Sequence, residues 1–237
     1  MSPAPLSWIR PEPWGIHVVP ADAWIDPARA VDRALVTHGH ADHARGGHGE
    51  TIATPATLDI MKLRYATSEG AKPVEYGETI RLPGGVDATY IPAGHVLGSA
   101  QILLEHAGER VVVTGDYKRR ADPTCPPFQV TPCDIFITEA TFGLPVFTHP
   151  PIVEEMTKLL DRLAAYPDSC VLVGAYALGK AQRVIAELRA AGHMQPIYLH
   201  GAMEKMCRLY EEHGVDLGEL RLVSDHSKDD MRGSIVV

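Results

Sequence analysis

The sequence predicts an α/β protein in two parts, and three observations support this prediction. Residues before position 148 form short β-like runs that are separated by glycine and proline. Residues after the segment Thr148-His149-Pro150-Pro151 alternate strand-like runs with segments of helical period, which favours parallel strand pairing. Neither part contains an internal repeat or a low-complexity tract. We therefore predict one domain over residues 1–148 and a second α/β domain over residues 149–237.

The first domain is expected to consist mostly of strands. Its apolar or alternating runs indicate strands, and one run of helical period, Thr57–Arg64, indicates a short helix. The expected strands are Gly15–Val19, Arg33–Thr37, Gly85–Pro92, Ala100–Glu105, Arg110–Thr114 and Asp134–Thr138, and the composition of the last predicts that it is buried.

The second domain is expected to alternate helices with strands. The expected elements are the helices Ile152–Tyr166, Gly179–Ala191 and Ala202–His213, the buried strand Cys170–Gly174 and the strand Pro196–Leu199. The last residues, Ser234–Val237, have the composition of the beginning of a buried strand. Natural domains seldom end on a β-branched run without a polar tail. We therefore expect the natural chain to continue past Val237 and the second domain to be incomplete here.

Composition and charge limit the classes of function. The net charge is −8, whereas a protein that holds nucleic acid on a broad basic face is usually positive, so any phosphate contact must be local. No run of about 18 apolar residues predicts a membrane span, and the N-terminus lacks the pattern of a secretion signal. The cysteines are scattered without C-x-x-C spacing, which favours a reducing cytoplasm over a disulfide framework or a thiolate zinc site.

The strongest chemical signal is the segment Thr37-His38-Gly39-His40-Ala41-Asp42-His43, directly after a predicted strand. Imidazole and carboxylate are ligands that suit zinc and similar divalent ions, and a loop at a strand end can direct several of them at one point. In an extended segment His38 and His40 point the same way and can share one ion. Asp42 and His43 follow at the bend and can reach a second ion. The alternative is a histidine-rich surface loop without metal.

Two further ligands are expected, because a metal site needs three or four protein groups. His95 lies in a glycine-flanked turn, Gly94-His95-Val96-Leu97-Gly98, after a predicted strand. Asp116 ends the apolar run Val111–Gly115, where aspartate is often only a turn former. Because a carboxylate has two oxygens, Asp116 is also a suitable group to bridge two ions.

The order H-x-H-x-D-H, then a G-H turn, then a strand ending in G-D, resembles the metallo-β-lactamase superfamily. The resemblance implies an αββα sandwich that binds two divalent metal ions, Zn2+ or alternatively Mn2+. It implies one ion held by His38, His40 and His95, a second held by Asp42 and His43, and Asp116 bridging. A further histidine is expected from a late S-D-H-A-D segment; Ser224-Asp225-His226-Ser227 is similar to it but lies earlier than expected.

Other segments resemble the β-CASP branch, whose members cut DNA or RNA and carry an inserted α/β domain. These segments are Gly94–Ala100, Thr114–Lys118, Thr138–Gly143 and Ala175–Gln182. The third reads T-E-A-T-F-G where the branch has E-S-T-[YF]-G, so Ala140 is a departure. In that branch the acid at the position of Glu139 acts together with a late histidine near the leaving group. Over residues 15–202 the chain is most similar to the bacterial DNA-ligase-associated exonuclease family.

The resemblance implies a metal-dependent DNA repair exonuclease, with 5′-to-3′ polarity favoured, that uses a metal-bridging hydroxide. Asp42 would orient or deprotonate the attacking water, Asp116 would bridge the two ions, and Glu139 would act near the leaving group. The family name further implies an association with an ATP-dependent DNA ligase. Three alternatives remain: an RNA-processing nuclease of the same branch, a small-molecule metallo-hydrolase of thioesterase or lactonase type, and a non-catalytic binding scaffold.

Contacts to substrate phosphate are expected at three places. Lys118 and Arg119 follow Asp116, although a solvated basic cluster is an equal alternative. Gly179 and Lys180 open a predicted helix, and His200 follows a predicted strand; helix N-termini favour phosphate, although an ordinary tight turn explains the first pair equally well. The tryptophans Trp8, Trp14 and Trp24 are either base-stacking platforms or, as we favour, packing residues.

Overall fold

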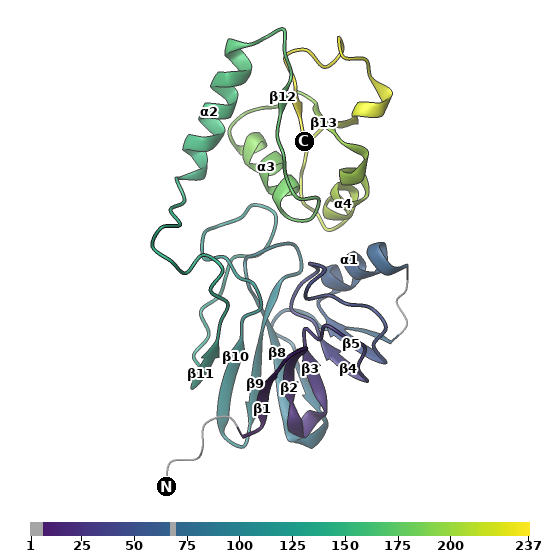
Figure 1. Cartoon of the computed structure of the whole chain (residues 1–237), viewed down its shortest axis with the longest axis vertical. Helices are drawn as coiled ribbons and strands as arrows, with labels where there is room; N and C mark the ends of the chain where they lie inside the picture. The colour runs from purple at the N-terminus through teal and green to yellow at the C-terminus, as the bar shows by residue number, and fades with distance from the viewer. Residues whose placement is uncertain (1–6, 67–69) are drawn as a thin grey trace. The chain divides into compact units, whose positions relative to one another are not determined.

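The computed structural model describes residues 7–66 and 70–237, and it divides into two compact units, Met1–Glu139 and Ala140–Val237 (Figure 1). The predicted α/β class is confirmed, because each unit combines sheets with helices. The predicted domain boundary at residues 148 and 149 stays a prediction. Within the described residues, no helix has the length and apolar character needed to cross a membrane.

The first unit contains two sheets. The six-stranded sheet has the strand order β1-β2-β3-β4-β5-β6, antiparallel through β3 and parallel from there on. The five-stranded sheet has the order β11-β10-β9-β8-β7 and is antiparallel except for the pair β10–β11. The strands are β1 (Ile9–Glu12), β2 (Gly15–Val18), β3 (Ala23–Ile25), β4 (Arg33–Leu35), β5 (Glu50–Ala53), β6 (Ala71–Pro73), β7 (Thr79–Leu82), β8 (Val86–Pro92), β9 (Ala100–His106), β10 (Glu109–Val113) and β11 (Ile135–Ile137).

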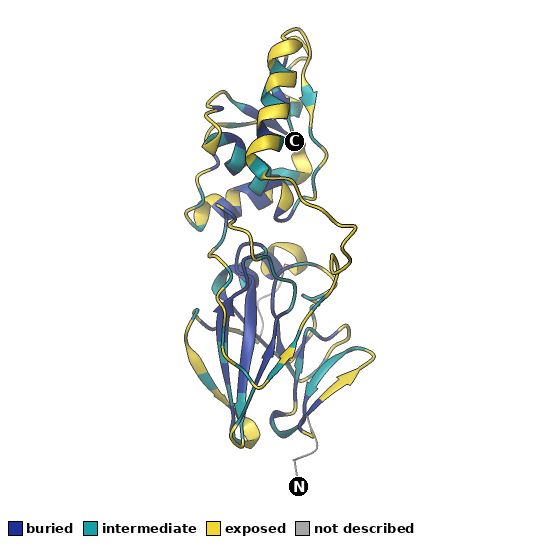
Figure 2. Ribbon diagram, turned by 90° about the vertical axis from the view of Figure 1, so that its left-hand side faces the viewer, coloured by how far each residue is buried: buried dark blue, intermediate teal, exposed yellow. Residues whose placement is uncertain are grey.

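A common core joins these two sheets face to face. Apolar side chains of both sheets form one buried cluster, and the fully buried Tyr90 of β8 donates a hydrogen bond across it to the Ile52 carbonyl of β5 (2.7 Å). Figure 2 shows that buried residues concentrate in the strands of this unit. A sheet face that packs against nothing would expose its apolar side chains to water. Burial of this apolar surface stabilises the fold by about 25 cal/mol per Å², which favours packing of the two sheets. The cluster includes Val18, Ile25, Leu35, Ile52, Val86, Tyr90, Ile102, Leu104 and Val111.

The helix α1 (Pro55–Tyr65) covers the outer face of the six-stranded sheet. Its start follows from local chemistry, since Thr54 caps it by accepting a hydrogen bond from the Thr57 N–H, and Pro55 is already restricted to a helical φ. Ala66 ends it with a left-handed φ of 54°. Among the described residues α1 is the only α-helix of this unit, so the second helical layer of the expected αββα sandwich is not found in them.

The second unit is a parallel four-stranded sheet of order β12-β15-β13-β14 with three helices. Its elements are α2 (Ile152–Ala165), β12 (Val171–Leu172), α3 (Lys180–Ala190), β13 (Ile197–Leu199), α4 (Gly201–Glu212), β14 (Leu220–Leu222) and β15 (Ile235–Val236). The parallel pairing expected from strand–helix alternation is therefore confirmed.

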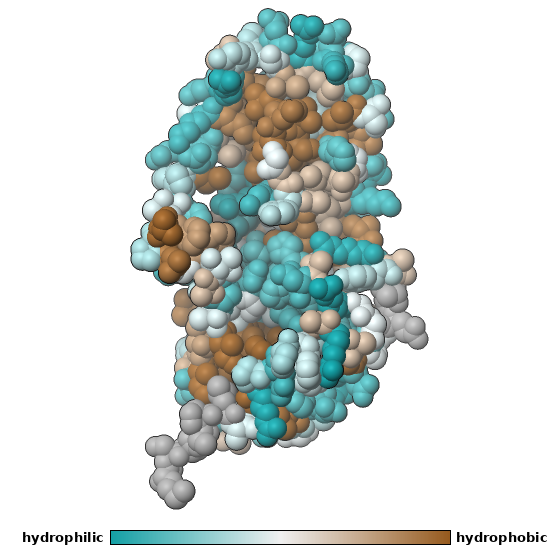
Figure 3. Space-filling view, viewed as in Figure 1, coloured by the Kyte–Doolittle hydropathy of each residue, from teal (hydrophilic) through white to brown (hydrophobic). Residues whose placement is uncertain are grey.

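Two predicted burials are wrong. Phe136 in β11 is 45% exposed, because β11 is an edge strand, and Leu172 in β12 is 74% exposed. Figure 3 shows apolar side chains gathered on the viewed face of the second unit, over β12 and β13. The composition of a strand indicates that its side chains can be buried. It does not indicate whether another layer of the protein covers the face of the sheet on which they lie.

Candidate metal centre

Strand direction brings the candidate ligands to one edge of the first unit. Because β3 and β4 are parallel, Asp26 after β3 and His38 after β4 lie at the same edge of the six-stranded sheet. Because β10 and β11 are parallel, Asp116 and Glu139 follow at the matching edge of the other sheet. The backbone N–H of Ala100 donates to the Thr37 carbonyl (2.8 Å), which links the two edges. The site is thus built where two sheets end together.

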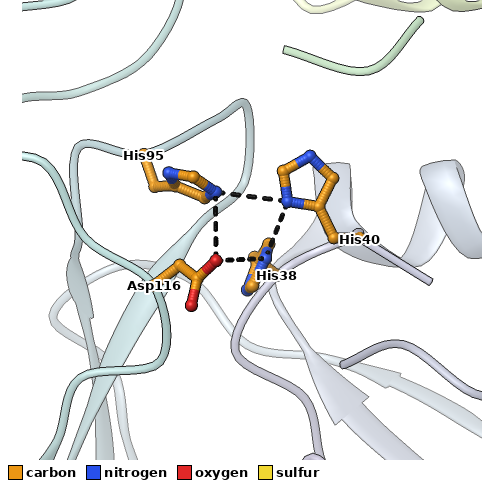
Figure 4. Close-up of side chains that lie close together, drawn as sticks. All are labelled: His38, His40, His95 and Asp116. Atoms are coloured by element: carbon orange, nitrogen blue, oxygen red, sulfur yellow. Dashed lines mark hydrogen bonds and ion pairs between the residues drawn. The ribbon is translucent and has the colours of Figure 1, made fainter. Parts of the chain in front are cut away.

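Four of the predicted ligands form one compact group, drawn in Figure 4. One ligand atom from each of His38, His40, His95 and Asp116 lies within 4.8 Å of all the others. Nδ1 of His40 is 3.0 Å from Nε2 of His38 and 3.2 Å from Nε2 of His95. Asp116 Oδ2 is 3.8 Å from His38 Nε2 and 3.6 Å from His95 Nε2.

The other two predicted ligands lie on the opposite side of Asp116. His43 Nε2 is 3.5 Å from Asp116 Oδ1 and 3.8 Å from Asp42 Oδ2. The two oxygens of Asp116 therefore face different groups, Oδ2 the three-histidine group and Oδ1 His43. This is the arrangement that a bridging carboxylate requires.

Asp26 holds the ligand loop in place. Its Oδ1 accepts the Thr37 N–H (2.8 Å), and its Oδ2 accepts the Thr37 hydroxyl (2.6 Å) and faces His43 Nδ1 at 2.8 Å. The contact with a carboxylate fixes His43 Nδ1 as the protonated nitrogen and leaves Nε2 with its lone pair toward Asp116. Asp26 itself has a φ of 47°, a left-handed conformation that aspartate tolerates better than most residues.

The turn that carries His95 is shaped by its own hydrogen bonds. The Ser99 hydroxyl accepts the backbone N–H groups of His95 (3.0 Å) and Val96 (3.2 Å). Gly94 has a φ of 70°, and a side chain there would lie 2.5 Å from the Lys118 carbonyl, so only glycine fits. The backbone, and not the side chain alone, directs His95 at the site.

Burial keeps two of the histidines neutral. Burial of His38, followed by the nearby imidazoles of His43, His95 and His40, lowers the pKa of His38 well below its usual value. Burial and the same kind of neighbours lower the pKa of His95 to about 4. Both rings therefore keep a free lone pair at neutral pH, which is the form that binds a metal ion.

On the carboxylate side of the site, the pKa values of His43 and Asp116 are raised. Burial alone lowers the pKa of His43, but the hydrogen bond and charge of Asp26, with the charges of Asp116 and Asp42, outweigh it and raise the pKa. Burial raises the pKa of Asp116, and the carboxylates of Glu139 and Asp42 add to this increase while His43 opposes it. The crowding of carboxylates is costly without cations nearby, and a divalent ion would remove that cost.

These observations fit a divalent metal. Ring nitrogens and carboxylate oxygens converge from three segments, and a two-oxygen group lies between two sets of ligands. This is the nitrogen and oxygen ligand set that zinc accepts. An open pocket adjoins the carboxylate side and gives a substrate access to it; its lining includes Gly15, Ile16, Asp26, Asp42, His43, Asp116, Thr138 and Glu139.

Glu139 lies in that pocket beside Asp42, His43 and Asp116.

Two of the predicted phosphate contacts, Lys118 and Arg119, follow Asp116 in the first unit. The Lys118 ammonium is bound to the carboxylate of Asp122, whose side chain is almost fully buried, and Arg119 is exposed. Lys118 therefore carries a structural ion pair, and its proximity lowers the pKa of His95.

The remaining predicted contacts belong to the second unit, at the starts of its helices. The Gly179 N–H, expected to be free for a phosphate, donates to the Gln182 side chain (2.8 Å). The Lys180 ammonium lies 5.2 Å from the centre of the Tyr176 ring. His200 caps α4 through a hydrogen bond from the Ala202 N–H. His226 packs against Tyr198 and faces the Leu222 carbonyl.

Sequence reasoning missed several supporting residues. Thr37 and Ser99 hold the ligand loops, and the Arg64 guanidinium at the end of α1 donates to the Gly39 carbonyl (2.7 Å). Thr37 and Ser99 each lie next to a motif, which was the available signal. Arg64 gave none, because its contact depends on how α1 packs.

Comparison with known proteins identifies the family. Residues 15–175 match the protein family described as "Metallo-beta-lactamase superfamily". The chain belongs to the metallo-beta-lactamase superfamily. The α/β class with several sheets is that of this superfamily, and its members bind divalent metals, usually zinc.

Individual relatives of this metallo-beta-lactamase chain are nucleic-acid enzymes by name. The chain is 30% identical over 228 residues to a probable DNA ligase of Opitutus terrae. The matched region is 94% of this chain and 22% of that protein. It is 28% identical over 243 residues to an endoribonuclease of Mycosarcoma maydis (84% and 27%). It is 30% identical over 213 residues to a ribonuclease of Thermus thermophilus (75% and 48%). The chain thus spans less than half the length of these three relatives.

Proposed function

We propose that this chain carries the site of a metal-dependent nuclease of the β-CASP branch that hydrolyses phosphodiester bonds in DNA, with a role in repair. The observation that carries the proposal is Asp116, whose two oxygens face two separate ligand groups beside an open pocket. The support for nucleic acid comes from the relatives, which are named as a DNA ligase and ribonucleases.

In this proposal His38, His40 and His95 would hold one ion, Asp42 and His43 would hold the second, and Asp116 would contribute to holding both. Two divalent ions held by these residues would supply an activated water near neutral pH and offset charge on the phosphoryl oxygens. Asp26 keeps the His43 ring oriented through its hydrogen bond. Asp42, with its side chain 78% exposed, can accept a proton from water in the pocket. Glu139 lines the same pocket and acts on the leaving-group side.

The substrate is proposed to be DNA, because the relative whose match covers 94% of this chain is named a probable DNA ligase. Cleavage from the 5′ end is proposed from the resemblance to the DNA-ligase-associated exonuclease family alone. The same relative supports a functional association with an ATP-dependent DNA ligase. RNA is the second candidate, because other relatives at 28% and 30% identity are named as an endoribonuclease and a ribonuclease. A DNA nuclease and an RNA nuclease would use the same metal ligands, and they would differ only in the kind of nucleic-acid strand that the pocket admits.

The deciding experiment combines metal analysis with cleavage assays. The purified chain is analysed by metal mass spectrometry and incubated, with zinc or manganese, with single-stranded DNA and RNA labelled at either end. We expect about two metals per chain, as the two ligand groups require, and release of nucleotides from the 5′ end of DNA. Asp116→Ala should abolish cleavage and lower the metal content, whereas Asp87→Ala, which removes an exposed carboxylate that pairs with Arg81, should change neither.

Each other outcome selects another function. Cleavage of RNA alone would make the chain an RNA-processing nuclease. Bound metal with hydrolysis of thioesters or lactones and of no nucleic acid would make it a small-molecule hydrolase. Binding of nucleic acid without metal and without cleavage would make it a scaffold. In either of the last two cases the nuclease proposal is wrong.

A further inference from the structure

The turn between β1 and β2 lies at the same edge as the metal centre. β1 is antiparallel to β2, β2 is antiparallel to β3, and β3 is parallel to β4, so the end of β1 and the start of β2 lie with the ends of β3 and β4. The turn residues are Pro13 and Trp14, and the next residue, Gly15, lines the pocket. The Trp14 carbonyl accepts the Ala28 N–H (2.8 Å), which holds the turn against the segment that follows Asp26.

The ring of Trp14 contacts the guanidinium of Arg29. The Arg29 guanidinium carbon lies 3.7 Å from the centre of the Trp14 ring, within the range of a strong cation–π contact. Trp14 in turn packs against Trp24 (6.1 Å between ring centres), and Trp24 stacks on His17 (4.2 Å, 10° between planes). Rings of the β1–β2 turn, β2 and β3 therefore hold an exposed arginine at the turn whose next residue, Gly15, lines the pocket.

The Arg29 guanidinium makes no hydrogen bond and no ion pair within the described residues, although its side chain is held by the stack. Two other arginines of the first unit pair with carboxylates: Arg33 binds Glu50, and Arg81 binds Asp87. A planar guanidinium that stacks through its face keeps its N–H donors at its edge, where they match two oxygens of a phosphate. The stack restricts the side chain before binding, so less conformational entropy is lost when a ligand binds.

The charge of the neighbouring pocket explains the need for such a group. Its lining carries four carboxylates, from Asp26, Asp42, Asp116 and Glu139. A nucleic-acid strand that enters it carries one negative charge per nucleotide and must be held by cations outside the metal ligands. The net charge of −8 gives no general attraction, so a local contact has to supply it. Lys118 does not meet this need, because it is paired with Asp122.

We infer that Arg29, held over the Trp14 ring, binds a backbone phosphate of the substrate strand next to the phosphodiester that is cut. The inference rests on the proposed function and adds a positioning residue to it. Arg29 sets the register of the strand in the pocket and takes no part in bond breaking. Its loss should therefore weaken binding and raise KM far more than it lowers kcat.

The test measures binding and turnover separately. Fluorescence anisotropy of a labelled single-stranded DNA decamer, and of the RNA of the same sequence, both with cleavage-resistant linkages, is recorded with zinc at several salt concentrations. For Arg29→Gln we expect affinity to fall about tenfold or more, as for the loss of a charged hydrogen-bonding pair. The slope of log affinity against log salt should also fall by about one. Arg29→Lys and Trp14→Leu should each lose part of the affinity, because the first keeps charge without the fork and the second keeps the fork without the stack.

Arg81→Gln is the matched control, since it removes one exposed positive charge from β7, near the turn that joins β7 to β8. It should bind and cleave as the natural chain does. Equal affinity and salt slope for Arg29→Gln and Arg81→Gln, with cleavage intact, would overturn the inference while leaving the nuclease in place. Absence of both binding and cleavage in the unmodified chain would overturn the proposed function and this inference with it.

Discussion

At the scale of single residues, the centre depends on side chains that never need to touch a metal ion. Asp26 accepts hydrogen bonds from both the N–H and the hydroxyl of Thr37, and it faces His43. The Thr37 hydroxyl also lies 3.1 Å from His38 Nδ1. One carboxylate thus orients a ligand of each proposed ion, through Thr37 for the first and directly for the second. Gly115 has a related role, because a side chain there would lie 2.4 Å from the Thr37 hydroxyl.

Asp26→Asn should lower zinc affinity by about 10–100-fold, as for other groups that orient metal ligands. The amide nitrogen that replaces Oδ2 is a donor, and it would face the protonated Nδ1 of His43. Competition with a zinc chelator measures the effect. Asp22→Asn is the matched control, because Asp22 also has a left-handed φ (46°) but is exposed, and its carboxylate pairs with the surface ring of His17 and not with a metal ligand. An unchanged zinc affinity in Asp26→Asn would contradict the role assigned to Asp26.

At the scale of elements, loops carry the chemistry and strands determine where the loops begin. The ligand loops follow β4, β8 and β10, and each ligand position is defined by the strand end before it. The second unit shows a comparable dependence of loops on one side chain. The Arg189 guanidinium of α3 donates to four carbonyls, those of His193, Gln195, Leu217 and Glu219, at 2.6–2.9 Å. It thereby ties the loops before β13 and β14 to the helix.

Arg189→Met should destabilise the chain by about 1–3 kcal/mol, because four carbonyls, two of them on the buried residues His193 and Leu217, lose a charged donor that water replaces only in part. Urea unfolding followed by circular dichroism measures this change. Arg208→Met serves as the control, because the Arg208 side chain is 69% exposed and pairs with the carboxylate of Glu204. Equal unfolding midpoints for the two variants would show that the carbonyl contacts of Arg189 add no stability.

At the scale of the whole molecule, the histidine cluster links stability to pH and to metal. In the folded chain without metal the pKa of His95 is about 4, against 6.5 in the unfolded chain. The unfolded chain therefore binds more protons between these pH values, and the free energy of unfolding falls as pH falls from 6.5 to 4. His38 acts in the same direction, because its pKa is also lowered, and His43 alone of the ligand histidines with shifted pKa acts against them.

We therefore expect the metal-free chain to lose stability progressively as pH falls from 6.5 towards 4. Urea unfolding in EDTA at a series of pH values measures the loss. His95→Gln should make the curve shallower, and His149→Gln, which changes an exposed histidine, should not. Zinc at neutral pH should raise the unfolding midpoint, because an ion that binds only the folded chain stabilises it. A pH-independent midpoint in EDTA would contradict the assigned burial of His38 and His95.

The sequence alone was enough to predict the α/β class, most of the strands and helices, and a set of six candidate ligands. Their order along the chain carries this information, since His38 to His43 are neighbours and Asp116 ends an apolar strand. Local patterns suffice for such features because they depend on spacing within one segment. Short or weakly patterned strands, such as β5 and β6, were missed, since they are held by pairing with distant partners.

Only the tertiary structure decided what surrounds those ligands. It separated the two oxygens of Asp116 between two groups, placed Asp26 under Thr37 and His43, and paired Lys118 with Asp122. It also left Phe136 and Leu172 exposed where composition predicts burial. These outcomes depend on contacts between segments far apart in the chain, and one residue's type does not specify its distant neighbours. The sequence determines which groups are available, and packing determines which of them meet.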